Sequence, residues 1–334
     1  FTPYWRHCMQ LGLPAPGSRQ QLSRGRFLEH ELKSLPPDHW ELLPTSPNWA
    51  EGWLKHWSPG SAGAQAALKR FASARLDGYK SARDFPSLEG SSRLSPHLHW
   101  GEISPRQACA AILAAQSAGD TDRQKFIAEI GWREFNHHLL FHFPHIPEQP
   151  FKPRFEHLPW TDSQGRLRAW QRGTTGYPIV DAGMRELWHT GFMHNRVRMI
   201  CASFLTKHLL IPWQWGARWF WDTLVDADLA NNSCGWQWVA GCGADAAPYF
   251  RIFNPVLQGK KFDGDGNYIR RWVPAIAGLP DRHLHAPWEA PEDVLAAANV
   301  TLGDNYPAPM VDHKEARAAA LDAYDVVSSA SDST

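Results

Sequence analysis

Apolar and polar residues follow a helical period along most of the chain after residue 60. The pattern begins in residues 63–85 (GAQAALKRFASARLDGYKSARDF) and returns in residues 104–119, 122–143, 181–190 and 194–211. Residues three and four positions apart share one face of a helix, so each stretch predicts a helix. Alternating strand patterns are scarce, and no repeated unit is found. The sequence therefore predicts an all-α fold.

Capping residues indicate where two of these helices begin. Ser104 precedes Pro105, which gives a side-chain cap followed by a proline in the first turn, and Gly119 is suited to end that helix. Ser95 and Pro96 repeat the arrangement in the stretch SPHLHW. We therefore expect one helix from residue 105 to Gly119 and another that starts at residue 96.

Composition divides the chain into three parts. Residues 1–60 are rich in Pro, Gly and Trp and predict linker and loop, residues 61–310 a single helical domain, and residues 311–334 a helix with a frayed tail. The chain opens with Phe1 rather than Met, in the aromatic stretch FTPYWRHC. This start favours the end of a linker from a missing upstream domain, and trimming of a tag is the alternative.

Composition also excludes several classes of protein. Lys+Arg and Asp+Glu number 34 each, so DNA binding would need a local basic patch on a neutral body. The five cysteines form no CxxC pair, which favours a reducing cytoplasm over a disulfide framework. No run of about 18 apolar residues predicts a membrane span. His137, His138, His142 and His145 lie close in sequence, but no Cys or carboxylate pattern completes a metal site, so we expect no metal.

Two of the predicted helices carry polar and large apolar residues on one face. The two sets are Glu129, Trp132, Arg133 and Asn136, and Asn195, Arg198, Met199 and Ala202. This mixture suits a pocket for a flat ligand with a polar edge better than it suits a core. An ordinary ion pair between Glu129 and Arg133 on a solvated face is the alternative. The residues alone leave both interpretations open.

The stretch NNSCGWQW, residues 231–238, places two tryptophans beside small residues and amides. Trp236 and Trp238 are two positions apart, so in a helix their rings point to different sides. Four nearby polar residues need partners if they are buried among so many aromatic rings: Asp226, Asp228, Asn231 and Asn232. Ligand hydroxyls or a structural Asp–Arg network would each provide such partners.

Residues 90–101 (GSSRLSPHLHWG) offer hydroxyls and backbone N–H groups that lead into the start of a helix. Such a segment is suited to bind a phosphate, because helix N-termini favour anions. By itself the signal is weak, since many capped helices have similar sequences.

Taken in order, these stretches resemble a known family. WREF, TGYPIVDAGMREL, MHNRVRM, DADLANN, GWQW and DAAPYFRIFNP follow one another as in the FAD-binding domain of DNA photolyases and cryptochromes. The likeness runs from about residue 1 to about residue 280 and is nearest to class I cyclobutane pyrimidine dimer photolyases. Each motif is weak alone, whereas the ordered set is specific. The family's N-terminal antenna domain is absent from this sequence, in keeping with the start at Phe1.

The resemblance implies a cofactor, a reaction and a partner. The family holds a U-shaped FAD inside a helical domain, below a cavity on a basic surface that faces DNA. The reduced flavin absorbs blue or near-ultraviolet light and donates an electron to a pyrimidine dimer flipped out of the DNA, which then splits and returns the electron. We therefore expect a deoxyribodipyrimidine photo-lyase that is monomeric, cytoplasmic and not membrane-bound. Its partner would be DNA containing pyrimidine dimers, and any antenna chromophore would belong to the missing domain.

The family's motifs assign cofactor-binding roles by position in this sequence. The expected contacts to the FAD diphosphate and its surroundings are Tyr79, Ser91, Ser92, Leu94 and Ser95. The other expected FAD contacts are Phe126, Arg133, Asn195, Arg198, Asp226, Asp228 and Asn232. Asn232 would face the flavin nitrogen that gains a proton on reduction, where an amide stabilises the reduced state without adding charge. Phe126 and Phe192 stand where relatives often have other aromatic residues, and Ser91 replaces a frequent Thr while it keeps the hydroxyl.

The resemblance also assigns residues to the lesion. Glu129 is expected to hydrogen-bond the damaged bases and to stabilise the negative charge that they gain. Trp132 and Trp238 would stack against the dimer, and Asn195 and Met199 would line the same cavity. The candidate phosphate contacts are Arg83 and, with less support, Lys260, Lys261, Arg270 and Arg271, for which plain solvation is an equal account.

Three tryptophans resemble the chain that carries electrons in this family. By position, Trp236, Trp213 and Trp160 are expected to pass electrons from the surface to photoexcited, oxidised flavin. Trp236 would then serve the flavin while Trp238 meets the substrate, in keeping with their different directions. Most of the other tryptophans are assigned to packing.

A cryptochrome, a photoreceptor that signals through partner proteins, is the main alternative. Plant and insect cryptochromes usually carry Asp or Cys at the position of Asn232, and many have longer tails. A (6-4) photolyase would be expected to place histidines at Asn195 and Met199, and the iron–sulfur branch needs four cysteine ligands at spacings not found here. A helical module that only binds DNA would leave Asp226 and Asp228 buried without a ligand. Repair of cyclobutane dimers is therefore the favoured prediction.

Overall fold

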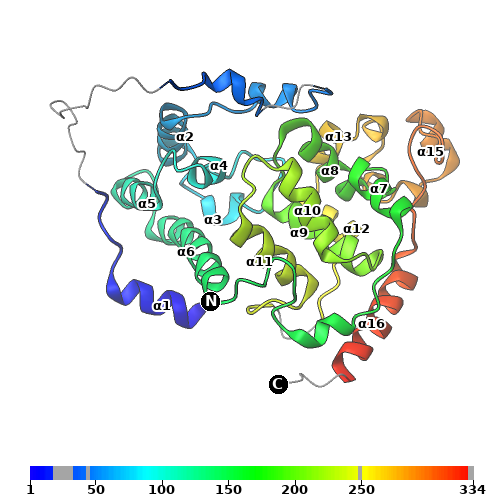
Figure 1. Ribbon diagram of the computed structural model, residues 1–334. Coiled ribbons are helices and arrows are strands. Elements are labelled where there is room, and N and C mark those ends of the chain that lie inside the picture. The colour runs from blue at the N-terminus through cyan, green and yellow to red at the C-terminus, as the bar shows by residue number, and fades with distance from the viewer. Residues whose placement is uncertain (18–32, 43–45, 247–249, 330–334) are drawn as a thin grey trace.

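Helices make up nearly all the regular structure of the protein (Figure 1). The computed structural model describes residues 1–17, 33–42, 46–246 and 250–329. Within these residues the only extended pairing is one isolated bridge between Leu302 and Tyr306. The predicted all-α fold is confirmed.

The first group of helices forms a small bundle, drawn from blue (α2) through cyan to teal green (α6) in Figure 1. Its members are α2 (Ser61–Ala74), α3 (Tyr79–Ala82), α4 (Ser95–His99), α5 (Pro105–Ala114) and α6 (Asp120–His142). α3 and α5 pack against α6, and α2 packs against α5. Phe71, Ile112 and Ile127 are among the side chains buried in this core. The long helix α6 therefore forms the side of this bundle that faces α11.

The second group builds the larger core. Its α-helices are α7 (Gln164–Arg172), α8 (Pro178–Thr190), α9 (Asn195–Ser203), α10 (Trp213–Thr223), α11 (Leu229–Ala240), α12 (Pro255–Phe262), α13 (Asn267–Trp272), α14 (Asp281–Leu284), α15 (Glu292–Ala297) and α16 (His313–Ser329). A π-helical turn, η4 (Phe204–His208), continues α9, and short 3-10 turns are η1 (Pro37–Trp40), η2 (Glu51–Lys55), η3 (Pro153–His157), η5 (Pro274–Ile276) and η6 (Pro287–Glu289). α11 packs against α6, α9 and α10, so it joins the two groups.

The predicted helix boundaries are partly right. Ser104 caps α5 in a capping box with Gln107, as predicted. Gly119 does not end that helix, because α5 stops at Ala114 and Gly119 instead precedes α6 as its N-cap. Ser95 is not a cap either, since α4 includes it and its side chain caps nothing. The chain reaches α4 from Leu94 in a helical conformation, which leaves no extended cap residue for a hydroxyl to use.

The entry segment departs from the predicted loop over residues 1–60. Thr2–Leu11 form α1, which packs against α6, and Pro3 stands in the first turn of α1. The ring of Trp5 lies so close to Gly131 of α6 that a Cβ there would collide with it. An apolar ring that packs into this gap favours a helix over a loop. The prediction of loop is therefore wrong for Thr2–Leu11, and residues 18–32 and 43–45 lie outside the described residues.

The chain ends in helix α16, as predicted, and the expected frayed tail at residues 330–334 lies outside the described residues. α16 packs against η3 and η4, with Tyr324 stacked on Phe250 at a ring separation of 4.5 Å. Among the described helices, none combines the length and the apolar character that crossing a membrane requires.

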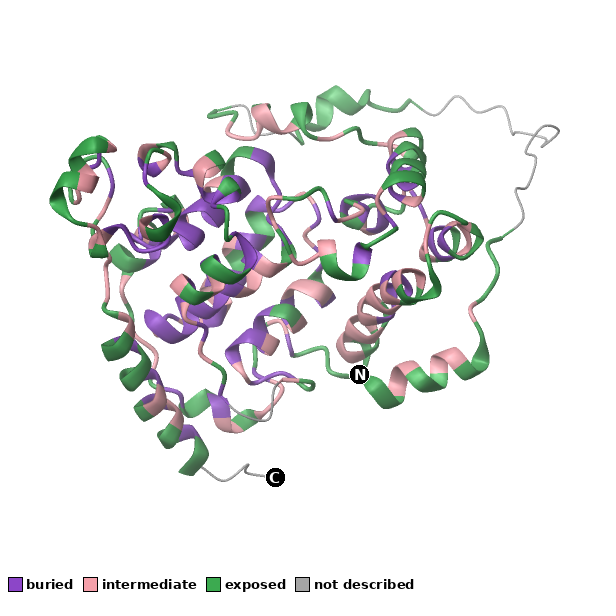
Figure 2. Ribbon diagram, turned by 180° about the vertical axis from the view of Figure 1, so that it is seen from behind, coloured by how far each residue is buried: buried purple, intermediate pink, exposed green. Residues whose placement is uncertain are grey.

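Most buried apolar residues fall into two clusters, and Figure 2 shows where buried residues lie along the chain. One spans residues 64–130 in the small bundle, and the other runs from Phe155 to Val327 in the larger core. α6 packs against α11, and α11 packs against α9, where the two cores meet. The polar faces predicted on α6 and α9 therefore come together at this boundary rather than in either core.

Candidate functional site

A cavity of about 680 Å³ opens between the two bundles. This volume falls within the usual range for small-molecule sites, about 300–1,000 Å³. Its walls come from α3, α4 and α6 on one side and from α9, α10 and α11 on the other. The predicted site residues that line it are Tyr79, Arg83, Ser91, Ser92, Leu94, Ser95, Phe126, Glu129, Trp132, Arg133, Asn195, Arg198, Met199, Asp226, Asp228, Asn232, Trp236 and Trp238. The predicted residues outside its lining are Trp213, Trp160, Lys260, Lys261, Arg270 and Arg271.

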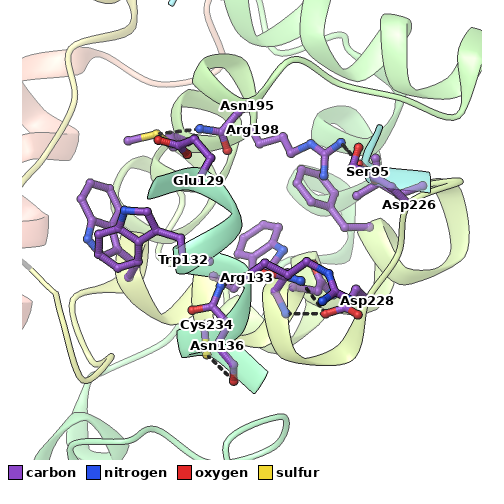
Figure 3. A pocket seen from close by; sticks show the side chains of 18 of the residues that line it. Ser95, Glu129, Trp132, Arg133, Asn136, Asn195, Arg198, Asp226, Asp228 and Cys234 are labelled. Atoms are coloured by element: carbon purple, nitrogen blue, oxygen red, sulfur yellow. Dashed lines mark hydrogen bonds and ion pairs between the residues drawn. The ribbon is translucent and has the colours of Figure 1, made fainter. Parts of the chain in front are cut away.

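Arg198, which is partly buried, and Asp226, which is buried, form an ion pair at one end of the cavity (Figure 3). Arg198 Nη2 donates to both carboxylate oxygens of Asp226, at 3.0 and 2.9 Å, and Arg198 Nε donates to the backbone oxygen of Met193 at 2.7 Å. The guanidinium also lies over the ring of Phe192. Because its polar and apolar faces are both engaged, Arg198 is held in one orientation. The structural Asp–Arg network considered for this segment thus exists, within the cavity wall.

Side chains from three helices surround the carboxylate of Asp228. Its Oδ1 caps α11 by accepting from the backbone N–H and the side-chain amide of Asn231, at 2.8 and 2.7 Å. Its Oδ2 lies 3.4 Å from Nδ1 of His99 in α4 and 3.3 Å from Nε2 of His137 in α6. Burial alone would raise the pKa of Asp228, but the bonds from His137, Asn231 and His99 hold it well below its ordinary value. Asp228 is therefore an anion that the folded chain orients from several sides.

Asn232 and Trp236 lie one turn apart on the cavity side of α11. Asn232 lines the cavity, and its Nδ2 donates to the backbone oxygen of Ala217 in α10 at 2.9 Å. The Trp236 ring is 3% exposed and lies 5.0 Å from the ring of Phe220. No hydrogen-bond partner for its Nε1 is found among the described residues. A buried indole N–H without a partner is unusual in a core and fits the edge of a ligand site.

Glu129 forms ion pairs that the predictions did not include. Arg83 Nη1 donates to Glu129 Oε1 at 2.7 Å, and Lys125 Nζ lies 2.8 Å from the same oxygen. Arg83, which was predicted as a phosphate contact, is paired with this carboxylate in the structure. The alternative of a Glu129–Arg133 pair is wrong. Glu129 pairs with Arg83 and Lys125, and Arg133 Nη1 lies 3.6 Å from Glu134 Oε1. Glu129 is thus held in the cavity wall by two cations.

The two tryptophans expected to stack on the lesion differ in their surroundings. The ring of Phe1 stacks on Trp132 with centroids 3.7 Å apart and an angle of 10° between planes. Trp132 therefore has an aromatic neighbour on one face. Trp238 lines the cavity as a partly buried ring. Asn195 and Met199 lie nearby on α9, one turn apart, with Asn195 Nδ2 3.9 Å from the Met199 sulfur (Figure 3).

The loop from Ser91 to Ser95 closes the cavity above α4. Ser92 Oγ accepts from the backbone N–H of Leu94 at 3.3 Å. Arg93 between them adopts a left-handed backbone conformation with φ +52°, and its guanidinium lies over Phe192 and Trp57. This conformation is rare for a residue with a Cβ and is held here by the two aromatic contacts. The loop presents hydroxyls in a fixed shape, as a phosphate site requires.

Trp213 and Trp160 line a second, smaller hollow of about 480 Å³ on the outside of the larger core. Trp213 is buried at 2% exposure, and Trp160 is partly exposed. Trp213 begins α10, and one turn later Gly216 packs directly against the Trp236 ring, where a Cβ would collide with it. Trp236 thus lines the cavity, and Trp213 and Trp160 line the outer hollow.

Sequence reasoning missed several residues of the cavity. His137 was considered only as part of a metal site, which was rejected, and His99 was not considered, yet both contact Asp228. Nothing local in the sequence links them, because they belong to different helices. Lys125 stands four positions before Glu129, and that helical spacing could have indicated the pair. The candidate phosphate contact Arg270 is instead committed to Asp281 and to the backbone oxygens of Asp265, Ala277 and Leu279.

Comparison with known proteins agrees with this geometry. A family model described as the FAD binding domain of DNA photolyase matches residues 126–326. A deoxyribodipyrimidine photo-lyase of Agrobacterium fabrum is 50% identical over 329 residues, which are 98% of this chain and 68% of that protein. This chain belongs to the DNA photolyase family. Cryptochrome-1 of Arabidopsis thaliana is 38% identical over 327 residues, which cover 95% of this chain and 48% of that protein.

A solved structure gives the same result for this photolyase-family domain. The crystal structure of a bacterial class III photolyase from Agrobacterium tumefaciens superposes with a TM-score of 0.87 at 53% identity, over 90% of this chain and 62% of that one. The predicted family is confirmed, while this relative belongs to class III where the prediction was class I. The chain spans from about half to about two thirds of the length of these relatives.

The family's cofactor is FAD, and the cavity fits it. The hydroxyl-bearing loop at Ser91 and Ser92 suits the diphosphate, and the anionic Asp228 suits ribityl or ribose hydroxyls. The unpartnered Nε1 of Trp236 and the aromatic side chains of Tyr79 and Phe126 complete a wall for a flat ring. The residues present thus match a ligand that has an anionic group, hydroxyls and a flat ring.

Proposed function

We propose that this chain is the catalytic part of a deoxyribodipyrimidine photo-lyase, which repairs cyclobutane pyrimidine dimers in DNA under light. One observation carries the proposal: a single cavity joins the cofactor end, at Arg198 and Asp228, to the end with Glu129 and Trp238. Relatives named deoxyribodipyrimidine photo-lyase at 45–50% identity support it. Reduced FAD, when bound, supplies the electron that light makes available.

The cofactor end is proposed to bind and orient FAD. The residues that we assign to it are Tyr79, Ser91, Ser92, Leu94, Ser95, Phe126, Arg133, Asn195, Arg198, Asp226, Asp228 and Asn232. Arg198 is fixed by Asp226 and Met193 and so offers its remaining surface in one place. Asn232, which bonds to Ala217, offers an uncharged amide to the ring edge. Such preformed contacts bind a ligand without reorganisation.

The other end is proposed to hold the flipped-out dimer. Glu129 accepts a hydrogen bond from a ring N–H of the dimer, Asn195 donates to a ring carbonyl, and Trp238 stacks on a base. The dimer accepts one electron, the two bonds that join its bases break, and the electron returns, so the reaction leaves no net redox change. Arg83 and Lys125 beside Glu129 place positive charge where the dimer becomes negative.

The tryptophan series is proposed to supply electrons when the cofactor is oxidised. Trp236 lines the cavity and touches Gly216. Trp213 lies one turn before Gly216 in α10, and both Trp213 and Trp160 line the outer hollow. Each residue passes an electron inward and recovers one from its outer neighbour. The final donor is a reductant in solution.

Light-dependent repair of a defined substrate tests the proposal. The FAD-loaded, reduced protein is mixed with an oligonucleotide that carries one thymine dimer and is illuminated with blue light, beside a dark control. We expect intact thymines to return only under light, as measured by chromatography. Unchanged dimer content after illumination would refute photolyase activity.

A cryptochrome-type photoreceptor is the second candidate function, because plant cryptochromes also match, at 38–44% identity. The same assay separates the two, since a photoreceptor would be photoreduced without loss of dimers. Three finer predictions belong to this proposal: a monomer, a cytoplasmic location, and residues 1–60 as the entry from an antenna domain. Sedimentation of the protein with and without dimer-containing DNA tests the monomer.

A further inference from the structure

Two cations converge on one oxygen of Glu129. Arg83 Nη1 and Lys125 Nζ lie 2.7 and 2.8 Å from Oε1, and no hydrogen bond to Oε2 is found in the part of the chain that the structure describes. All three side chains line the cavity beside Trp132. One oxygen of this carboxylate is therefore occupied, and the other is available to a ligand.

Arg83 and Lys125, which together we call the Glu129 clamp, come from two different elements. Lys125, Glu129 and Trp132 stand at positions i, i+4 and i+7 of α6, so they share one stripe of the helix. Arg83 follows α3, which packs on α6, and its guanidinium also lies 5.6 Å from the Tyr79 ring centroid. Because the two cations approach from different elements, the carboxylate cannot turn freely. Its orientation is set before a ligand arrives.

The charges of the Glu129 clamp and of Glu129 itself do not cancel. Arg83 and Lys125 carry two positive charges against the one negative charge of Glu129, which leaves one positive charge in the cavity wall. A base that gains an electron beside this wall becomes negative, and a fixed positive charge favours that state more than the neutral one. Lys125 provides the excess, since Arg83 alone would balance Glu129.

We propose that Lys125 is a further positioning residue for the dimer, an inference that rests on the proposed function. With Arg83 it occupies Oε1 of Glu129 and so presents Oε2 to a ring N–H of the bound pyrimidine. Its charge also offsets the negative charge that the dimer gains. Lys125 acts through Glu129 and does not need to touch the DNA.

Contact with a DNA phosphate is the other role open to a lysine at this place, and it predicts a different pattern. A phosphate contact weakens binding to all DNA sequences about equally when it is removed, and it leaves the bound complex intact. A residue that orients Glu129 affects damaged DNA selectively and affects repair even when all protein is bound. Affinity in the dark and yield at saturation therefore separate the two roles.

The experiment compares Lys125→Met, Lys125→Arg and a control, Lys69→Met, in which an exposed lysine of α2 is changed. Dark affinities are measured for oligonucleotides with and without a thymine dimer, and repair yield is measured at saturating damaged DNA. For Lys125→Met we expect both the affinity for damaged DNA and the yield to fall about two- to fivefold, as for a partly exposed ion pair. Affinity for undamaged DNA is expected to stay the same, Lys125→Arg to restore both values, and Lys69→Met to match the wild type.

Three results would overturn the inference. The first is equal loss of affinity for damaged and undamaged DNA with full yield at saturation, which would make Lys125 a phosphate contact. The second is a wild-type yield in Lys125→Met. The third is a wild-type protein that does not repair at all, which would refute the proposed function itself. FAD content and circular dichroism confirm that each variant is folded, and Lys125→Gln replaces Lys125→Met if that variant does not fold.

Discussion

Trp236 lies where the cavity wall meets the larger core. Phe220 and Trp170 contact its ring from two sides, with centroids at 5.0 and 6.1 Å, and Gly216 packs against its edge. Trp238, two residues later on the same helix, lines the cavity with a partly buried ring. The different directions predicted for these two rings follow from the helical period, and the structure gives each ring a different set of neighbours.

At this residue we expect Trp236→Phe to slow the photoreduction of oxidised FAD while repair by chemically reduced protein continues. Phenylalanine fills most of the same space, at a cost in stability of about 1–2 kcal/mol, but it is far harder to oxidise than an indole. Flavin absorbance under light measures photoreduction, and dimer content measures repair. Trp221→Phe, an exposed tryptophan of α10, is the matched control. Equal loss of both activities would contradict the proposed electron-transfer role.

Single residues could be predicted where a local pattern or a family motif marks them. Glu129, Arg198, Asp226 and Asn232 were placed correctly in the cavity because a short motif surrounds each of them. The contacts of Asp228 with His99 could not be predicted, since helix packing decides which side chains from distant segments meet. The Arg83–Glu129 pair was missed for the same reason: α3 and α6 are packed together only in the folded chain.

At the scale of elements, α6 and α11 show which helix boundaries the hydrophobic period can predict and which it cannot. The pattern over residues 122–143 predicted α6 closely, and the structure extends it to Asp120–His142. α11 was not bounded in advance, because small and aromatic residues gave it little amphipathic character. Its start is set by Asp228 as N-cap and its end by Gly241 in a left-handed conformation. Its position depends on how closely α10 can approach.

The close packing of α10 on α11 depends on Gly216. A Cβ at this position would collide with the Trp236 ring and with Leu205, so we expect Gly216→Ala to destabilise the fold by about 1–3 kcal/mol through overpacking. Gly165→Ala in α7 is the control, because nothing lies within 4 Å of a Cβ built there. Chemical denaturation measures both variants. If Gly216→Ala is as stable as the wild type, the two helices are not in tight contact.

At the scale of the whole molecule, the cavity exists because the chain forms two cores instead of one. Residues of the small bundle contribute Glu129 and Lys125, and residues of the larger core contribute Arg198 and Asp226. The predicted all-α domain was correct, but composition and periodicity do not reveal a boundary between cores. The site lies at that boundary, so its complete lining required the structure.

Buried histidines make the stability of this molecule depend on pH. Burial, and to a lesser extent the nearby His313, whose Nδ1 lies 2.9 Å from His208 Nε2, together lower the pKa of His208 from 6.5 to about 3. The unfolded chain binds a proton at this histidine below about pH 6.5, while the folded chain does not. Stability from His208 is therefore complete above that pH and declines as the pH falls toward 3. Burial raises the pKa values of Asp181 and Glu186. Their effect on stability is therefore opposite to that of His208: it becomes more favourable as the pH falls.

A difference between two proteins isolates the contribution of His208. Between about pH 7.5 and pH 5.5 we expect the wild type to lose about 1.4 kcal/mol more unfolding free energy than His208→Asn, in which this proton site is absent. Denaturant titrations at both pH values measure the difference, and the other titrating groups cancel to first order because both proteins share them. His7→Asn, a change at an exposed histidine of α1, should leave the pH dependence unchanged. Equal losses in wild type and His208→Asn would show that His208 takes up its proton without leaving the core.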